Sequence, residues 1–494
     1  MLPMRILKKI LIALAVLLVL AAIAIWWLTR PDTAEYTLDE TSGTDPVLAE
    51  PDPQLFPTIG IAEPVGWAEG TAPTAGEGLA VNRFAEGLDN PRVVYTLPNG
   101  DVLVTLTKAP ERELAGGWLE DFVAGWLFDK AGAGGESANQ LVLLRDANED
   151  GVAEEQITIR EDDLDSPSGI AWGEDKLYIA NHDEVLMFDY TLGSNAVTGE
   201  PEQLTPLPAA GNHWMRNIIL SPDGRYLYVA VGSASNIGEG GMEIEDMRAA
   251  IHQLDLESGE ARLWGQGLRN PNGMAFSPWS GELWTTVNER DMLGSDLVPD
   301  YMTNVPIGVH YGWPWVYYKD VFDERVEAPM PQFLTEYTRK PVYALGAHAA
   351  ALGMVFTEEG TRMGEAFGPG AFIARHGSWN RSPADGYDVV FVRFDERGNP
   401  TGLPIRVLES FLTGDGDTYG RPTWVEWDRT GALLVSDDTA GIIWRVIAPD
   451  AAPAAAIERN RGERLPPVRQ LEGDPRRRLQ EAFEEGAVRP EDIM

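Results

Sequence analysis

The sequence predicts an all-β protein: a six-bladed β-propeller of four-stranded antiparallel blades, preceded by an N-terminal transmembrane helix. An apolar run, a turn rich in Gly, Pro or Asp, and a second apolar run recur six times, at intervals of roughly 50 to 80 residues. Such alternation indicates antiparallel strands, and repeats of this size are typical of propeller blades. The turns lie at 97–100, 172–175, 221–224, 277–281, 368–370 and 427–431, and the fifth repeat is the weakest match.

The composition excludes several kinds of site. The chain has no cysteine, which rules out disulfides, thiolate zinc sites, covalent haem attachment and a cysteine nucleophile. Its 77 acidic residues outnumber its 39 basic ones, giving a formal net charge of -38. Such a surface repels a phosphate backbone, so we expect no nucleic-acid partner.

The N-terminus predicts membrane attachment. Arg5, Lys8 and Lys9 precede an unbroken apolar run from Ile10 to Leu28, which is long enough to cross a bilayer. We expect residues 1–30 to be an uncleaved inner-membrane anchor that places the rest in the periplasm or elsewhere outside the cytoplasm. A cleaved signal peptide is the alternative, with its cleavage site at 22–24.

Four segments are expected along the chain. Residues 1–30 form the anchor or signal sequence, 31–55 an acidic Pro-rich flexible linker, 56–448 the propeller, and 449–494 a linker and short helix. Within the propeller, residues 117–130 carry an apolar stripe at helical spacing. It predicts a helix that packs against a blade, or a surface that meets the membrane or an electron acceptor.

Polar and basic residues precede each repeat's turn. They are Arg92, Ser168, His213 with Arg216, Arg269 with Asn270, His348, and Arg421. Equivalent positions in a closed ring of repeats face one axis, so we expect these cations to converge on an anionic ligand.

Three of these groups suggest chemistry. His213 is suited to act as a general base near neutral pH, and Arg269 with Asn270 to stabilise charge on a carbonyl or quinone oxygen. Guanidinium, imidazole and indole groups also gather in one loop, which suits a planar ligand with several carboxylates. That loop carries Arg375, His376, Trp379 and Arg381, with Arg421 and Arg216 as further cofactor-binding candidates. Structural ion pairs and a core histidine are the alternative interpretations.

Two acidic segments suggest calcium. The first contains Glu289, Arg290, Asp291 and Asp296, although chance clustering is common in so acidic a chain. The second begins like an EF-hand loop with Asp146, Asn148, Asp150 and Gly151, followed by Glu154, but Ile157 stands where the bidentate glutamate belongs. It predicts a structural calcium site or a plain acidic turn.

Several motifs together resemble the pyrroloquinoline quinone (PQQ) dependent sugar dehydrogenases, especially the L-sorbosone dehydrogenase-like branch and the soluble aldose sugar dehydrogenases. They run in order from about Leu79 to Val446: LRDANEDGVAEE, GNHWMRN, SPDGRYLYVAVGS, GLRNPNGMAFSP, VNERDMLGSDLVPDY, HYGWPWVYY, ARHGSWNRSPADGY, and GRPTWVEW with SDDTAGIIWRV.

The resemblance implies a six-bladed propeller that holds PQQ and calcium over its central channel. It implies that His213 removes a sugar hydroxyl proton, that Arg269 polarises the quinone carbonyl, and that Arg421 binds a cofactor carboxylate. Calcium would take main-chain oxygens from the segment Glu289–Asp291, where this chain has Arg290-Asp291 in place of Gly-Pro. Ser168 stands at the position where the glucose-oxidising branch has a glutamine.

The sequence thus predicts oxidation of an aldose or a sorbosone-like aldehyde. A separate cytochrome or quinone would accept the electrons, because no haem-attachment motif is present. Two alternatives remain open: a calcium-dependent propeller lactonase, and a non-catalytic propeller that binds glycans or proteins.

Overall fold

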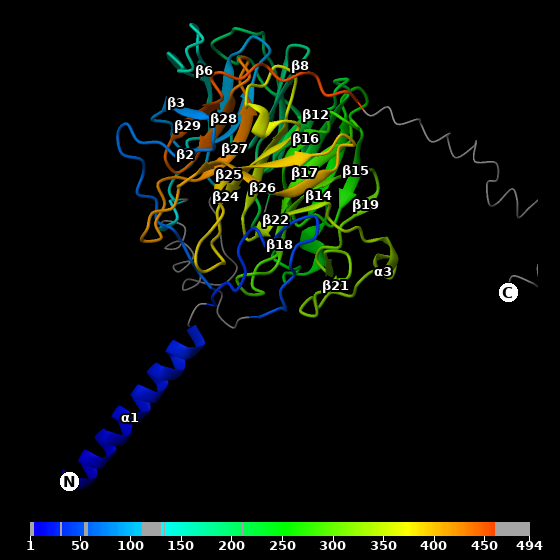
Figure 1. Cartoon of the computed structure of the whole chain (residues 1–494). Helices are drawn as coiled ribbons and strands as arrows, with labels where there is room; N and C mark the ends of the chain where they lie inside the picture. The colour runs from blue at the N-terminus through cyan, green and yellow to red at the C-terminus, as the bar shows by residue number, and fades with distance from the viewer. Residues whose placement is uncertain are drawn as a thin grey trace, which may run out of the picture.

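Six four-stranded antiparallel blades make up the body of the protein in a computed structural model (Figure 1). The structure describes residues 4–29, 32–53, 58–110, 130–132, 134–209 and 211–459. The predicted all-β, six-bladed propeller is confirmed. The helix expected at 117–130 and the C-terminal helix lie outside the described residues, except for residue 130.

Each predicted repeat forms one blade. Blade 1 holds β4 (Pro91–Thr96), β5 (Val102–Leu106), β6 (Gln140–Arg145) and β7 (Glu155–Arg160), and blade 2 holds β8 (Gly169–Gly173), β9 (Lys176–Ala180), β10 (Glu184–Asp189) and β11 (Glu202–Pro206). Blade 3 holds β12 (Ile218–Leu220), β13 (Tyr226–Val231), β14 (Ala250–Asp255) and β15 (Ala261–Gln266), with β19 (Val309–His310) added in parallel.

The remaining blades close the ring. Blade 4 holds β16 (Asn270–Phe276), β17 (Leu283–Asn288), β18 (Pro299–Asn304) and β22 (Tyr343–Ala347), and blade 5 holds β23 (Ala351–Phe356), β24 (Gly370–His376), β25 (Tyr387–Phe394) and β26 (Pro400–Glu409). Blade 6 joins β27 (Pro422–Trp427), β28 (Leu433–Asp437) and β29 (Ile442–Ile447) to β3 (Ala80–Glu86), which comes from the N-terminal side of blade 1. This pairing of distant segments locks the toroid.

The first strands of the blades line the central axis, because they contact one another in the cyclic order β4, β8, β12, β16, β23, β27. Strands β20 (Val316–Tyr317) and β21 (Val321–Phe322), the short helix α3 (Leu334–Tyr337), and the 3-10 turns η1 (Met242–Glu245) and η2 (Glu365–Phe367) lie in connections. The weak fifth repeat is explained by the long connection that carries η2 between β23 and β24.

The hydrophobic core is divided among the blade interfaces. Successive strand residues point to opposite faces, so Leu103 packs toward blade 2 while Val104 packs toward blade 6. Each of the six buried apolar clusters contains residues from two neighbouring blades. Period-two alternation in the sequence therefore serves two interfaces at once.

Two ends of the propeller are distinguished by strand direction. The loop end is the end at which the first strand of each blade begins and the second strand finishes. It also contains the connections between the second and third strands. At the hairpin end lie the tight turns between first and second strands, which the sequence motifs marked. The residues predicted to converge all precede or begin first strands, so they belong to the loop end.

The linker predicted at 31–55 is not a free tether. Leu38 is buried, and β1 (Ser42–Gly43) adds to the edge of blade 4 by pairing with β22. Strand β2 (Thr74–Ala75) adds to blade 5. Acidic and proline-rich composition suggested disorder, but the backbone of this arm finds hydrogen-bond partners in the propeller. The flexible-linker prediction is wrong for residues 32–53.

A helix forms over the N-terminal apolar run. It is α1 (Met4–Thr29), and it extends away from the propeller on the side of β18 and β21 (Figure 1). Within the residues that the structure describes, no helix combines the length and apolar character that crossing a membrane requires. The transmembrane character of the segment stays a prediction.

Candidate active site

The loop end brings together most of the residues that precede the first strands. Arg92, His213, Arg269, His348 and Arg421 lie there in two linked clusters. The ends of the second strands supply their partners, which the sequence analysis missed in part: Ser233, Asp291, His376 and Asp438. The predicted convergence of cations on one end of the toroid is therefore observed.

His213 is held by a backbone acceptor. Its Nδ1 lies 2.8 Å from the Ser233 carbonyl oxygen and 3.0 Å from the Ser233 hydroxyl. A carbonyl only accepts, so Nδ1 donates and the neutral ring keeps its basic lone pair on Nε2. Gly232 permits this approach, because a Cβ there would lie 2.4 Å from Asn270 Oδ1 and 2.5 Å from His213 Cβ. This tautomer suits a general base.

Arg269 is buried and fixed by blade 4. Its Nη2 donates to Asp291 Oδ2 at 2.9 Å, and its Nη1 donates to the Glu289 carbonyl at 2.6 Å. Asn236, from the connection after β13, accepts from Nη2 through its side-chain oxygen at 2.9 Å. A planar guanidinium with this many fixed acceptors has one orientation, which electrostatic stabilisation of a ligand oxygen requires.

Asp291 links Arg269 to His348. His348 Nδ1 lies 3.3 Å from Asp291 Oδ1, and its Nε2 lies 2.9 Å from the Gly294 carbonyl. Burial alone would lower the pKa of His348, but the bond and charge of Asp291 raise it, since both ring nitrogens face acceptors. Burial opposes ionisation of Asp291, yet Arg269 and His348 lower its pKa. Protonation of His213 would lower the pKa of Asp291 further, so the groups of the first cluster surround one carboxylate.

The second cluster is cationic. Arg92 Nη1 donates to Asp438 Oδ2 at 2.5 Å, and His376 Nε2 lies 2.9 Å from the same oxygen. Arg421 donates through Nη2 to the Tyr387 hydroxyl at 3.1 Å and lies over that ring. Burial and the nearby cations lower the pKa of His376, and those cations hold the pKa of Asp438 well below its usual range against the effect of burial.

Two buried polar atoms in this cluster have no hydrogen-bond partner among the residues that the structure describes: Arg421 Nε and Asp438 Oδ1. The segment before β12 connects this cluster to His213, because Met215 Sδ accepts from Arg92 and the Trp214 ring lies 5.3 Å from its guanidinium carbon. Arg421 Nε is a buried donor that a ligand carboxylate could satisfy, and Asp438 Oδ1 is an acceptor that requires a donor on the ligand. The donor set therefore fits PQQ.

The segment predicted to hold calcium lies beside Arg269. The Glu289 carbonyl accepts from Arg269, and the Arg290 guanidinium pairs with Asp323 from the inserted β20–β21 region. Asp300, which follows in the same acidic segment, accepts from the Glu289 and Ala350 amides at 2.8 and 2.6 Å. Burial raises the pKa of Glu289 to about 7 and that of Asp300 to about 6. Both Asp291 carboxylate oxygens already bind Arg269 and His348, and Arg290 has no oxygen in its side chain, so of these three residues Glu289 has the carboxylate that engages the fewest partners.

Four predicted site residues have other roles in the structure. Arg375 is buried inside blade 5, where Asp388 and the Leu345 carbonyl take its donors. Arg381 and Asp296 pair with each other and bind the N-terminal arm. Arg216 donates to the His213 and Pro208 carbonyls, so it holds the backbone of His213 in place. Burial lowers its pKa to about 9. These corrections follow from internal acceptors that a sequence does not reveal.

The last two candidates are separate from both clusters. Trp379 is 39% exposed on the loop end, and its carbonyl accepts from the Gly60 amide. The EF-hand-like turn lies between β6 and β7, at the hairpin end. Carboxylate oxygens of Asp146, Asp150 and Glu154 lie within 4.8 Å of one another there, and Asn148 donates to Glu154. That turn is remote from the first strands' starts, so an ion there would be structural.

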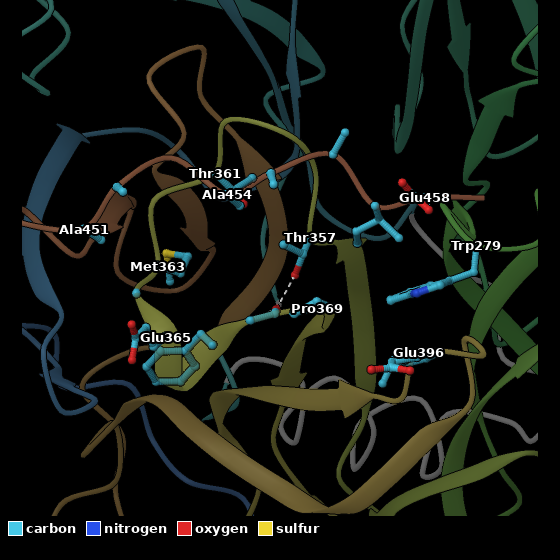
Figure 2. A pocket seen from close by; sticks show the side chains of 18 of the residues that line it. Trp279, Thr357, Thr361, Met363, Glu365, Pro369, Glu396, Ala451, Ala454 and Glu458 are labelled. Atoms are coloured by element: carbon cyan, nitrogen blue, oxygen red, sulfur yellow. Dashed lines mark hydrogen bonds between the residues drawn. The ribbon is translucent and has the colours of Figure 1, made fainter. Parts of the chain in front are cut away.

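A pocket of about 1150 Å³ also lies at the hairpin end, between blades 4, 5 and the C-terminal segment 450–458. Figure 2 shows Trp279 and Glu396 on one side of it and Met363 and Glu365 on the other. Thr357 is fixed at its centre by a 2.9 Å bond to the Gly368 carbonyl. None of the convergent residues lines it, so it is distinct from the candidate active site.

Comparison with known proteins places this arrangement in a family. The TrAA12-like family model matches residues 136–306 and 332–449, more than half of the chain. An uncharacterised protein of Borreliella burgdorferi is 28% identical over 300 residues, covering 57% of this chain and 76% of that protein. The aldose sugar dehydrogenase YliI of Escherichia coli is 32% identical over 123 residues, which are 22% of this chain and 31% of YliI. The match thus spans about a third of YliI.

Solved structures share the fold. A Trichoderma reesei carbohydrate-active enzyme of family AA12 gives a TM-score of 0.62 at 20% identity, covering 76% of this chain and 97% of that chain. The PQQ domain of pyranose dehydrogenase from Coprinopsis cinerea gives 0.59 at 20% identity, covering 78% and 100%. The family match covers most of the propeller and confirms the resemblance read from the sequence motifs: the chain belongs to the TrAA12-like family.

Proposed function

We propose that the protein oxidises a sugar, an aldose or a sorbosone-like aldehyde, in a reaction that depends on PQQ and calcium. The convergence of Arg92, His376 and Arg421 beside a tautomerically fixed His213 is the observation that carries the proposal. The Coprinopsis cinerea structure is described as a holo PQQ domain of a pyranose dehydrogenase, and YliI as an aldose sugar dehydrogenase. Both descriptions agree with this chemistry.

Arg92 and Arg421 would hold the carboxylates of the cofactor, and His376 would add a third donor. Glu289 would offer carboxylate oxygens to calcium. When bound, PQQ supplies a quinone that accepts two electrons as hydride. Arg269, with Asn270 beside it, would stabilise negative charge on a ligand oxygen.

His213 would carry out the proton transfer. Its Nε2 accepts the proton of the substrate hydroxyl as the C–H hydrogen leaves with its electron pair, and the product is a lactone from a hemiacetal or an acid from a hydrated aldehyde. The Ser233 carbonyl stabilises the imidazolium that forms, because Nδ1 continues to donate to it. Arg216 keeps the residue in place through its carbonyl.

We further propose that α1 attaches the protein to the inner membrane, with the propeller in the periplasm. Lys8 and Lys9 precede the apolar positions of α1, in the order that keeps cations in the cytoplasm. The electrons would then pass to a separate cytochrome or quinone.

A reconstitution assay tests the proposed chemistry. Purified apoprotein receives PQQ and calcium, then a panel of aldoses, ketoses and aldehydes with an artificial dye. We expect dye reduction that requires PQQ. Hydrolysis of a lactone without PQQ would instead support a propeller lactonase. The absence of both activities would support a non-catalytic binding protein.

A further inference from the structure

The segment that follows α1 is fastened to the loop end. The Asp32 carboxylate accepts from the Ser295 amide at 2.7 Å, and the Glu35 amide donates to Asp296 at 2.6 Å. Asp296 also accepts from Arg381 at 2.8 Å, and both of these side chains are buried. The path of the chain is therefore fixed from Asp32 onward.

This fastening fixes where α1 begins its departure. Three peptide steps separate Thr29 from Asp32, so their Cα atoms lie at most about 11 Å apart. Asp32 contacts Ser295, and Ser295 follows Asp291 of the candidate site by four residues. The C-terminal end of α1 must lie at the rim of the loop end, in agreement with Figure 1.

The side chains of α1 are covered by no described part of the protein. Leu14, Leu17, Leu18 and Leu20 are each more than half exposed. Ile12, Val16, Val19 and Ile23 are also more than half exposed and occupy the other side of the helix, so one protein surface could not bury all these positions together. A lipid environment surrounds a helix completely and removes this apolar area from water.

The loop end itself carries exposed apolar side chains. Ile244 (48%) and Met247 (47%) lie in the connection that also supplies Ser233 and Asn236 to the site. Phe322 (55%) precedes Asp323, the partner of Arg290. Three more exposed apolar side chains lie nearby: Ile59, Val65 and Trp379. The segment of Ile59 and Val65 is hydrogen-bonded to residues 379–380 and to Thr418.

We propose that the loop end, with the candidate site, faces a lipid bilayer. In this arrangement α1 lies in the membrane and the apolar side chains of the loop end contact the interface. The net charge of -38 opposes attraction to anionic headgroups, so the contact is apolar and suits a zwitterionic bilayer. An electron acceptor in the membrane would then reach the site directly. The inference rests on the proposed membrane attachment and is independent of whether α1 crosses the bilayer and of the proposed chemistry.

Single cysteines test this orientation without further changes, since the chain has none of its own. Ile244→Cys and Phe322→Cys place a fluorophore on the loop end of the full chain, and Val152→Cys, on the β6–β7 turn at 47% exposure, is the matched control. Each labelled protein is reconstituted with phosphatidylcholine vesicles that contain nitroxide lipids. We expect quenching of several-fold at residues 244 and 322, and little quenching at 152.

Three outcomes would overturn the proposal: equal quenching at the two ends, quenching only at residue 152, or failure of the full chain to float with the vesicles. Binding that disappears in 0.5 M salt (roughly a 4 Å Debye length) would show an ionic contact and also overturn it. Dye reduction by detergent-solubilised protein is measured separately. A protein that floats in the expected orientation but oxidises no sugar refutes the proposed function alone.

Discussion

Arg269 and Asp291 join the beginning of β16 to the segment after β17, with Arg269 Nη2 2.9 Å from Asp291 Oδ2. The Asp291 carboxylate partly neutralises the positive charge of the buried Arg269 guanidinium. Through His348, it also ties blade 4 to the start of blade 5. The charge that Arg269 presents to a ligand therefore depends on Asp291.

Asp291→Asn should lower kcat/KM for the sugar about 10- to 100-fold, the effect of losing a charge-assisted hydrogen bond of about 1.5–3 kcal/mol. Steady-state dye reduction measures it. Asp255→Asn is the matched control, because it breaks another Arg–Asp pair, with Arg225, on the surface. Equal activity of Asp291→Asn and Asp255→Asn would remove Asp291 from the site.

His213→Gln should keep PQQ and lose turnover by about 10²- to 10⁴-fold, because an amide cannot accept the proton. Cofactor content is read from the absorbance of the reconstituted protein and turnover from dye reduction. Ser233→Ala is the control: it leaves the carbonyl that orients Nδ1 and should change turnover by less than about threefold. An active His213→Gln protein would refute the role of the base.

Glu426 provides a test of pH-dependent stability. Burial raises the pKa of this carboxyl, on the innermost strand β27, from 4.5 to about 8. The folded state thus binds its proton more tightly than the unfolded state, so stability is full below pH 4.5 and declines as the pH rises toward 8. The shift corresponds to at most about 5 kcal/mol, and partial exposure of the side chain reduces this to about 1–3 kcal/mol.

Glu426→Gln should therefore raise the free energy of unfolding at pH 8 and leave it unchanged at pH 4. Denaturant titrations at the two pH values measure the difference. Glu257→Gln, on an exposed turn, should change neither value. A Glu426→Gln protein with the wild-type pH dependence would contradict the pKa assigned to this carboxyl.

Arg381→Gln should release the N-terminal arm. Removing Arg381 from this buried ion pair leaves the Asp296 carboxylate charged and without its cationic partner, which costs about 3–5 kcal/mol of stability. Hydrogen exchange should accelerate over residues 32–40 while the blade strands stay protected. Arg225→Gln, whose pair with Asp255 lies on the surface, is the control and should leave residues 32–36 unchanged. Wild-type protection in Arg381→Gln would show that other contacts hold the arm.

The fold was largely predictable because the period-two alternation and the turns are local signals. The loop-end convergence of Arg92, His213 and Arg421 was predictable as well, since equivalent repeat positions share an axis. Asp438 could have been found by the same rule applied to the ends of second strands, where Ser233, Asp291 and His376 also lie.

Other features depend on contacts between distant segments. Arg375 and Arg381 read as free cations in one polar loop, but Asp388 and Asp296 neutralise them in the fold. The arm at 32–53 was expected to be flexible because of its composition, but it pairs with the edge of blade 4 and is bound by Ser295, Asp296 and Arg381. Asp296 lies 85 residues from Arg381, so a single sequence carries no local signal of that pair, and the pairing of Arg375 with Asp388 depends on the register of β24 and β25.

The most direct test of the account is calorimetric titration of the apoprotein with PQQ in the presence of calcium. We expect one site per chain, with affinity about 10- to 100-fold weaker in Arg421→Ala, because a charge-assisted pair is lost. Arg225→Ala, an exposed arginine, should bind as the wild type does. Absence of a saturable site, or equal affinity in Arg421→Ala, would contradict the claim that the loop-end cations form the cofactor site.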